Sequence, residues 1–130
     1  MRNNRNLPTI IIACSEEPLR RVLVYSLCTL GCEVESVASH KALVGRCALR
    51  HYALILTCFR EPLIEGYSTV GRLRGGSGGN SSLFVLTANP SPSEVVTLLE
   101  RGVEQVLSLP VSTTRLRRKI EGSLARRSGV

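Results

Sequence analysis

Residues 52–66 read Tyr-Ala-Leu-Ile-Leu-Thr-Cys-Phe-Arg-Glu-Pro-Leu-Ile-Glu-Gly, and the rest of the chain is interpreted outward from this stretch. The unbroken apolar run from Ala53 to Leu56 favours a strand that is buried on both faces of a parallel sheet. Pro62 and Gly66 then mark a loop that leads into a helix. Because ligands of an open α/β sheet bind outside the carboxyl ends of its strands, Cys58 stands where chemistry is expected.

The rest of the chain repeats a strand followed by a helix. Strands are expected over residues 9–14, 33–37, 52–57, 83–87 and 105–108, and helices are expected to begin near residues 15, 39, 65, 91 and 112. Five such units predict a flavodoxin-like (βα)5 doubly wound parallel sheet with strand order 2-1-3-4-5, in which strands one and three are neighbours.

Local signals support several of these boundaries. Ser15 is expected to cap the first helix, which Gly31 ends. Ser91, followed by Pro92 and Glu94, predicts a capping box. Residues 75–82 are rich in Gly and Ser and predict a flexible loop, which lacks the Lys that a phosphate-cradling loop requires.

Length and composition indicate one domain without a membrane span. The chain has 130 residues, of which 43% are hydrophobic and 21% charged, as in soluble globular proteins. No run approaches the roughly 18 apolar residues of a transmembrane helix, and residues 1–8 do not resemble a signal peptide, so a cytoplasmic protein is expected. The expected organisation is a basic tail over 1–8, a domain over 9–124, and a basic tail or linker over 125–130.

The residues quoted above carry a resemblance to a known family. Tyr52, the run Leu54-Ile55-Leu56, Pro62 and Gly66 resemble the third strand and following loop of response-regulator receiver domains of the CheY-like type. In that family an Asp four residues before the Pro and eight before the Gly accepts a phosphoryl group. Both counts lead to Cys58, and the resemblance extends over nearly the whole chain.

The resemblance implies a set of chemical groups that this chain mostly lacks. A working receiver holds Mg²⁺ with an acidic pair after strand one, and places a Ser or Thr after strand four and a Lys before a Pro after strand five. Here the acidic-pair positions carry Cys14 and Ser15, the lysine position carries Leu109, and only Thr87 matches. All ten acidic residues are Glu, so the chain has no Asp.

This pattern predicts a degenerate receiver, or pseudo-receiver, without a metal or other cofactor. Mg²⁺ prefers oxygen ligands, and an acyl phosphate can form only on a carboxylate. One nearby carboxylate, Glu16, makes a poor magnesium site by itself. The Thr87 hydroxyl, with nothing left to sense, is expected to bond to local backbone.

The resemblance therefore implies a signalling module that is not an enzyme and acts by protein–protein contact. Its C-terminal end resembles the receivers of OmpR/PhoB-type transcription regulators, so an attached or partner DNA-binding domain is expected. The family's usual homodimer uses the fourth helix, the fifth strand and the fifth helix. Charged residues of both signs are expected on that surface, namely Glu94, Glu100, Arg101, Glu104, Arg115, Arg118 and Lys119.

Two alternatives remain open. Cys14 and Cys58 should lie on adjacent strand ends, so they could serve as a thiol redox sensor, although small packing residues are the simpler interpretation. The net charge is +7, and the basic C-terminal helix could contact nucleic acid directly. Cys28 and Cys32 are interpreted as packing residues, and both histidines as surface residues.

Overall fold

The computed structural model describes residues 7–75 and 79–127, over which strands and helices alternate. The strands are β1 (Thr9–Ala13), β2 (Glu33–Val37), β3 (Leu54–Phe59), β4 (Ser82–Ala88) and β5 (Gln105–Leu109). The helices are α1 (Glu17–Leu27), α2 (His40–Leu49), α3 (Ile64–Gly75), α4 (Pro92–Glu100) and α5 (Thr113–Arg127). The strands form one parallel sheet in the order β2-β1-β3-β4-β5, which confirms the predicted flavodoxin-like (βα)5 architecture.

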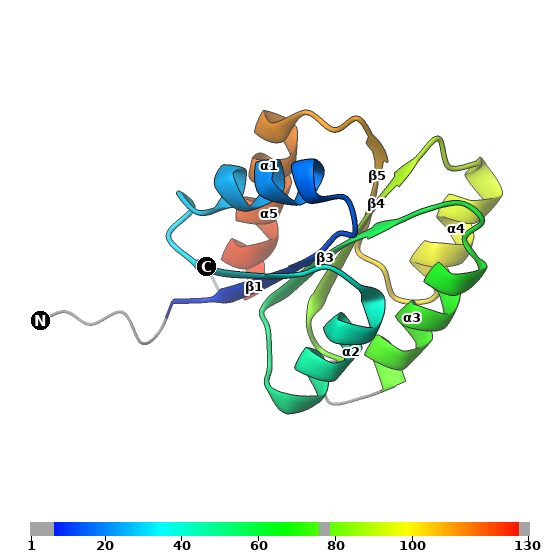
Figure 1. Ribbon diagram of the computed structural model, residues 1–130, viewed down its shortest axis with the longest axis horizontal. Helices are drawn as coiled ribbons and strands as arrows, with labels where there is room; N and C mark the ends of the chain where they lie inside the picture. The colour runs from blue at the N-terminus through cyan, green and yellow to red at the C-terminus, as the bar shows by residue number, and fades with distance from the viewer. Residues whose placement is uncertain (1–6, 76–78, 128–130) are drawn as a thin grey trace, which may run out of the picture.

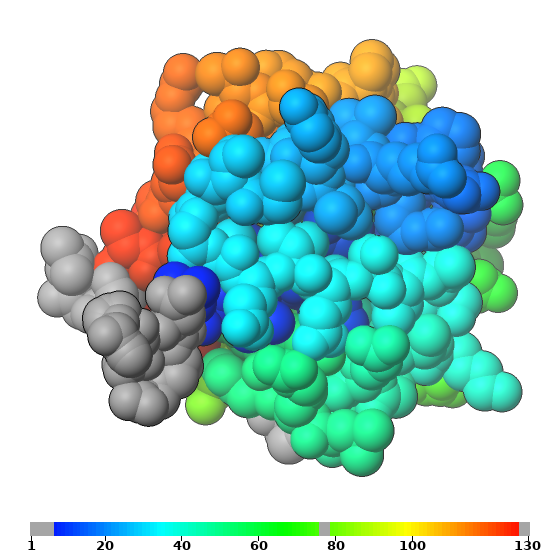
Figure 2. Space-filling view, turned by 60° about the vertical axis from the view of Figure 1, so that its left-hand side comes forward, coloured from blue at the N-terminus to red at the C-terminus, as the bar shows by residue number. Residues whose placement is uncertain are grey.

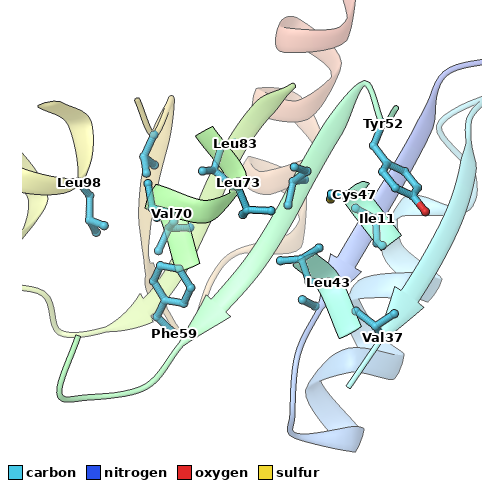
Figure 3. Close-up of a cluster of buried hydrophobic side chains, with 14 of the residues drawn as sticks. Ile11, Val37, Leu43, Cys47, Tyr52, Phe59, Val70, Leu73, Leu83 and Leu98 are labelled. Carbon is cyan, nitrogen blue, oxygen red and sulfur yellow. The ribbon is translucent and has the colours of Figure 1, made fainter. Parts of the chain in front are cut away.

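Helices cover both faces of this sheet, with α1 and α5 on one face and α2, α3 and α4 on the other (Figure 1). On the α1/α5 face, the strand residues Ile12 and Leu56 are fully buried in one cluster with Leu23 and Leu116. On the opposite face, Ile55 belongs to a second buried cluster (Figure 3). Because successive side chains of a strand point to opposite faces, the apolar run of β3 supplies both clusters.

Strand β2 lies at one edge of the sheet, as the predicted strand order requires. Figure 2 views the molecule from the side of β2 (cyan), which reaches the surface between α1 (blue) and α2 (blue-green). Only Val37 of its five residues is buried, and the other four are exposed or partly buried, whereas β1 is buried throughout. The burial of the two strands therefore reflects their central and peripheral places in the sheet.

The helix caps agree with the sequence in part. The Ser91 capping box is present, with both the Ser91 and the Glu94 side chains bonded to backbone amides. The prediction that Ser15 caps α1 is wrong, because the N-cap is Glu16, whose side chain makes no capping bond. The helix ends at Leu27, and Gly31, with φ of +70°, lies in the turn beyond it.

The last helix is longer than expected. It continues to Arg127, beyond the predicted end near Leu124, because Arg126 and Arg127 bond to Glu104 and to the Asn80 carbonyl at the neighbouring end of the sheet. The predictions for residues 1–6, 76–78 and 128–130 lie outside the described residues. Within the described ranges, none of the helices combines the length and apolar composition that a membrane span requires.

Candidate functional site

Cys14 and Cys58 lie side by side at the carboxyl ends of β1 and β3. These strands are parallel neighbours, and their register pairs Ala13 with Thr57, so the next residues, Cys14 and Cys58, stand opposite each other. Cys14 is 2% exposed, and its backbone amide donates to the Val37 carbonyl at 3.1 Å. The predicted adjacency of the two strand ends thus follows from strand order and register together.

Both cysteines line a cleft of about 820 Å³ between α2 and α3, called here the α2–α3 cleft. The lining also includes exposed Ser15 and the first turn of α2. Its charged side chains carry both signs, and they are Lys41, Arg60, Glu61, Glu65 and Arg72. The cleft therefore opens at the carboxyl end of the sheet, where ligands of this architecture bind. The Cys58 side chain also packs against the α1/α5 core cluster, so its thiol lies at the end of the sheet rather than deep between α2 and α3.

His40 is a site residue that sequence reasoning missed. Its Nε2 lies 3.1 Å from the Cys58 carbonyl, to which it donates when that nitrogen carries the proton. The ring stands edge-on to Phe59, with centroids 5.0 Å apart. The available signal was the Ser39 cap, because the first turn of a helix that follows an edge strand lies beside the carboxyl ends of the strands. The prediction that His40 is a simple surface residue is wrong, whereas His51 is exposed.

The environment of Cys58 holds its thiol in the protonated form. Burial raises the pKa of Cys58, and the neighbouring Cys14 thiol and the Glu16 carboxylate raise this pKa further. A thiolate is the reactive form of cysteine, so Cys58 is a weak nucleophile at neutral pH. This environment is unlike that of a catalytic cysteine, whose pKa is lowered by a nearby positive charge or a helix N-terminus.

The residues at this end do not fit the magnesium ion that the receiver fold implies. Two thiols, a hydroxyl and Glu16 are the donors, and Mg²⁺ prefers several oxygen ligands in an octahedral arrangement. Glu16 is turned toward Arg60, whose Nη2 lies 3.8 Å from its carboxylate. No group of three or more His, Cys, Asp or Glu residues able to hold a metal occurs in the described part of the chain.

Thr87 lies near the carboxyl end of β4, as predicted, but its hydroxyl does not form the predicted hydrogen bond. Its hydroxyl is buried and has no hydrogen-bond partner among the described residues, so the predicted bond to local backbone is wrong. The reason is its central position, because Thr87 is paired with Phe59 on one side and Ser108 on the other. Nearby backbone groups are used in the sheet. The Thr57 hydroxyl, two residues before Phe59, is buried and unpartnered in the same sense.

Leu109 occupies the position that the resemblance assigns to a lysine. It is half-buried and packs against the α1/α5 core cluster, and the peptide bond to Pro110 is cis. Leu109 does not contribute to the lining of the α2–α3 cleft. An apolar side chain packed in this way supplies no charge to the carboxyl end of the sheet.

Several charged residues of the surface predicted for dimerisation form contacts within the chain itself. Glu94 is used in the capping box, and Arg101 lies over the Tyr67 ring at 5.0 Å. Glu104 accepts from Arg126 at 2.7 Å. Glu100, Arg115, Arg118 and Lys119 form no ion pair with another described residue. The surface also exposes two apolar residues of α4, Val96 at 52% and Leu99 at 44%.

Known proteins resemble this chain in fold and in sequence. The receiver domain of the Francisella response regulator 1452 superimposes with a TM-score of 0.83 at 18% identity, covering 92% of this chain and 98% of that one. The receiver domain of the sensor histidine kinase PA1611 from Pseudomonas aeruginosa, solved with a magnesium ion in its active-site cleft, gives a TM-score of 0.79 at 24% identity, with coverages of 92% and 98%. The chain has the fold of a CheY-like receiver domain.

The sequence relatives of this receiver-fold chain are longer proteins. The probable transcriptional regulator ycf27 of Galdieria sulphuraria is 28% identical over 126 residues, which cover 97% of this chain and 49% of that regulator. The chain spans about half the length of the curated relatives it matches. No family model matches the chain.

Proposed function

We propose that this chain is a signalling module of the receiver type that works without aspartyl phosphorylation. The observation that carries the proposal is the replacement of chemical groups at three strand ends, by Cys14, Cys58 and Leu109, in a chain without Asp. The similar receiver domain of PA1611 was solved with magnesium in its cleft, whereas the donors available here are poor magnesium ligands. Signalling through the scaffold then requires contact with another protein rather than a reaction.

The module is proposed to regulate transcription through an attached or partner DNA-binding domain. The curated relatives are named as probable transcriptional regulators and are about twice as long as this chain. The remaining half of such a protein has room for a second domain of ordinary size. This role needs no enzymatic activity in the receiver fold itself.

The proposed contact surface is formed by α4, β5 and α5, and its proposed occupant is a second copy of the chain. Val96 and Leu99 supply exposed apolar area. Glu100 on one side, with Arg115 and Arg118 on the other, supplies unpaired charges of both signs that an isologous pairing can match. Without a phosphorylation switch, such a dimer forms constitutively or under the control of a protein partner.

The loss of phosphorylation is tested with acetyl phosphate or beryllofluoride in the presence of Mg²⁺, read by amide NMR shifts. The expected result is no specific shift at Glu16, Cys58 or Thr87, because no carboxylate accepts the group and no pair of carboxylates holds the ion. Saturable shifts confined to these residues would overturn the proposal. The reagents are checked in parallel on a receiver domain that carries the acidic residues.

The dimer is tested by size-exclusion chromatography with light scattering. Leu99→Arg places a charge on the exposed apolar part of the proposed surface and is expected to give a monomer. Leu49→Arg is the matched control, because Leu49 is 84% exposed on α2, away from that surface, and it is expected to leave the dimer intact. A wild-type chain that stays monomeric at high concentration would contradict the proposed homodimer.

Direct nucleic-acid binding by α5 is less well supported by the geometry. Arg126 donates to Glu104, and Arg127 donates to the Asn80 carbonyl, both at 2.7 Å, so part of the basic charge stabilises the fold. A salt titration of DNA binding tests this alternative, since phosphate contacts weaken steeply as the salt concentration rises.

A further inference from the structure

We propose that Cys14 and Cys58 are a modification site, at which a hydroperoxide converts the two thiols into a reversible disulfide. This inference concerns the cleft and is independent of the dimer surface proposed above. Among the five cysteines, none of which forms a disulfide within the described residues, these two occupy opposite positions on neighbouring strands. The same two cysteines also contribute to the lining of the α2–α3 cleft.

The strand register is the first support for this proposal. Neighbouring strands lie about 4.7–4.9 Å apart, and disulfides join residues whose Cα atoms are about 4.4–6.8 Å apart. Ala13 and Thr57 are paired, so Cys14 and Cys58 continue the pairing by one position. Side chains at opposite positions of parallel strands also point to the same face of a sheet. A disulfide between these residues therefore needs little movement of the backbone.

Access is the second support. Cys14 is 2% exposed, whereas Cys58 is half-buried, and both contribute to the lining of the cleft. Of the two thiols, Cys58 is therefore the more accessible to a small oxidant. Cys14, beside it, is placed to act as the resolving thiol, the arrangement typical of redox-sensing cysteines.

The reaction is balanced with one hydroperoxide. The Cys58 sulfur attacks a peroxide oxygen, the O–O bond breaks, and a sulfenic acid forms with release of an alcohol, or of water from hydrogen peroxide. The Cys14 sulfur then attacks the Cys58 sulfur, the S–O bond breaks, and one molecule of water leaves, formed from the hydroxyl of the sulfenic acid and the Cys14 thiol proton. Two thiols lose two electrons and two protons, and the hydroperoxide gains them.

The raised pKa of Cys58 predicts how fast this reaction runs. Burial and the neighbouring thiol disfavour the thiolate, and the thiolate is the attacking species. The oxidation is therefore expected to be slow near neutral pH and to accelerate as the pH rises. This behaviour sets the site apart from a peroxidase cysteine, which reacts readily at neutral pH.

Peptide mapping tests the proposal in the folded full chain. Hydrogen peroxide is added, the remaining thiols are blocked with an alkylating agent, and the chain is cut with trypsin. Cleavage after Arg and Lys leaves Cys14 in residues 6–20 and Cys58 in residues 51–60, while Cys28 and Cys32 share residues 22–41. The expected product is peptide 6–20 linked to peptide 51–60. Its mass is lower by two hydrogens than the sum of the two peptide masses, and dithiothreitol separates it into the two peptides.

Matched variants and a second measurement make the outcome decisive. Cys28→Ser removes an exposed thiol outside the cleft and is expected to give the same linked peptide, whereas Cys58→Ser is expected to give none. The oxidised chain is also expected to unfold at a higher urea concentration, since a cross-link restricts the unfolded chain. A linked peptide that forms only in urea, or a Cys58 that is oxidised without joining Cys14, would overturn the proposal.

Discussion

Buried hydroxyl groups are hydrogen-bonded at one end of the sheet and lack partners at the other. At the amino end, where β3 and β4 begin, the Ser81 hydroxyl donates to the Tyr52 carbonyl at 2.6 Å, and the Ser123 hydroxyl donates to Ser82 at 2.9 Å. At the carboxyl end, the buried hydroxyls of Thr57 and Thr87 have no partner among the described residues. Figure 3 shows Tyr52 and Phe59 at these opposite ends of β3.

The difference between these hydroxyl groups separates those that stabilise the fold from those that lie at the candidate functional site. Buried polar groups in folded proteins are nearly always hydrogen-bonded, because an unpaired group costs free energy. At the amino end, the Ser81 and Ser123 hydroxyls obey this rule through contacts between distant parts of the chain, and the buried polar atom without a partner there is the Arg74 Nε, not a hydroxyl. The carboxyl end departs from it where ligands of this architecture bind, and in the same place Cys14 and Cys58 stand where the receiver resemblance implies carboxylates.

The largest expected effect is at the amino end. Tyr52 is 1% exposed, and its hydroxyl donates to Glu35 at 2.7 Å. Tyr52→Ala removes a large buried ring and is expected to lower the free energy of unfolding by about 3–5 kcal/mol. Tyr52→Phe keeps the ring and loses only the hydrogen bond, so a loss of about 1 kcal/mol is expected. Urea unfolding measures both, and equal losses would show that ring packing is not the main term.

The next effect tests whether the carboxyl end is loosely packed. A Cβ at Gly66 would lie 2.6 Å from the Phe59 ring, so Gly66→Ala is expected to destabilise the fold by about 1–3 kcal/mol. Adding Phe59→Leu should relieve the clash, and the double variant should lose less than the two single losses added together. Gly71→Ala is the control, since nothing lies within 4 Å of its added Cβ. Additive losses would contradict the proposed contact.

The sequence predicted those features that depend on local pattern. The apolar run of β3 and the capping box at Ser91 are each determined within a few residues, and each is present. The adjacency of Cys14 and Cys58 also followed, since strand order and the position of each residue along its strand determine it. The position of the candidate site could therefore be predicted without knowing which residues far apart in the sequence contact each other.

Features that depend on distant contacts could not be read from the sequence. The bond from His40 to the Cys58 carbonyl requires the packing of α2 beside β3. The Thr87 hydroxyl lacks a partner because the backbone groups of the two neighbouring strands, β3 and β5, are already paired in the sheet. The extension of α5 to Arg127 depends on Glu104 and Asn80, far away in the chain. Each of these misses involves a partner more than 15 residues away.

Raising the pH should weaken the fold through two buried thiols. Burial raises the pKa of Cys47 from 9.0 to about 11 and raises the pKa of Cys58. The folded chain then holds these protons more tightly than the unfolded chain, so the stabilisation is complete below about pH 9 and is lost as the pH rises through the folded-state pKa. For Cys47 the loss by about pH 10 is on the order of 1 kcal/mol.

The pH effect is measured from urea midpoints at about pH 8 and about pH 10. Cys47→Ala and Cys58→Ala should each reduce the difference between the two midpoints, whatever their effect at the lower pH. Cys47 lies in the buried core, whereas Cys58 contributes to the lining of the cleft. The two variants therefore separate the effect of the core thiol on the pH dependence from the effect of the Cys58 thiol. An unchanged difference in both variants would rule out the two thiols as its cause.

The smallest effect compares the two ends of the sheet directly, because removing a buried hydroxyl should change sign between them. Thr57→Val and Thr87→Val remove hydroxyls that are desolvated without a partner, so each is expected to stabilise the fold by about 1 kcal/mol. Ser81→Ala removes a hydroxyl that bonds to the Tyr52 carbonyl and is expected to destabilise it by about 1 kcal/mol. Destabilisation by either Thr substitution would mean that its hydroxyl has a partner, and the contrast between the two ends would then fail.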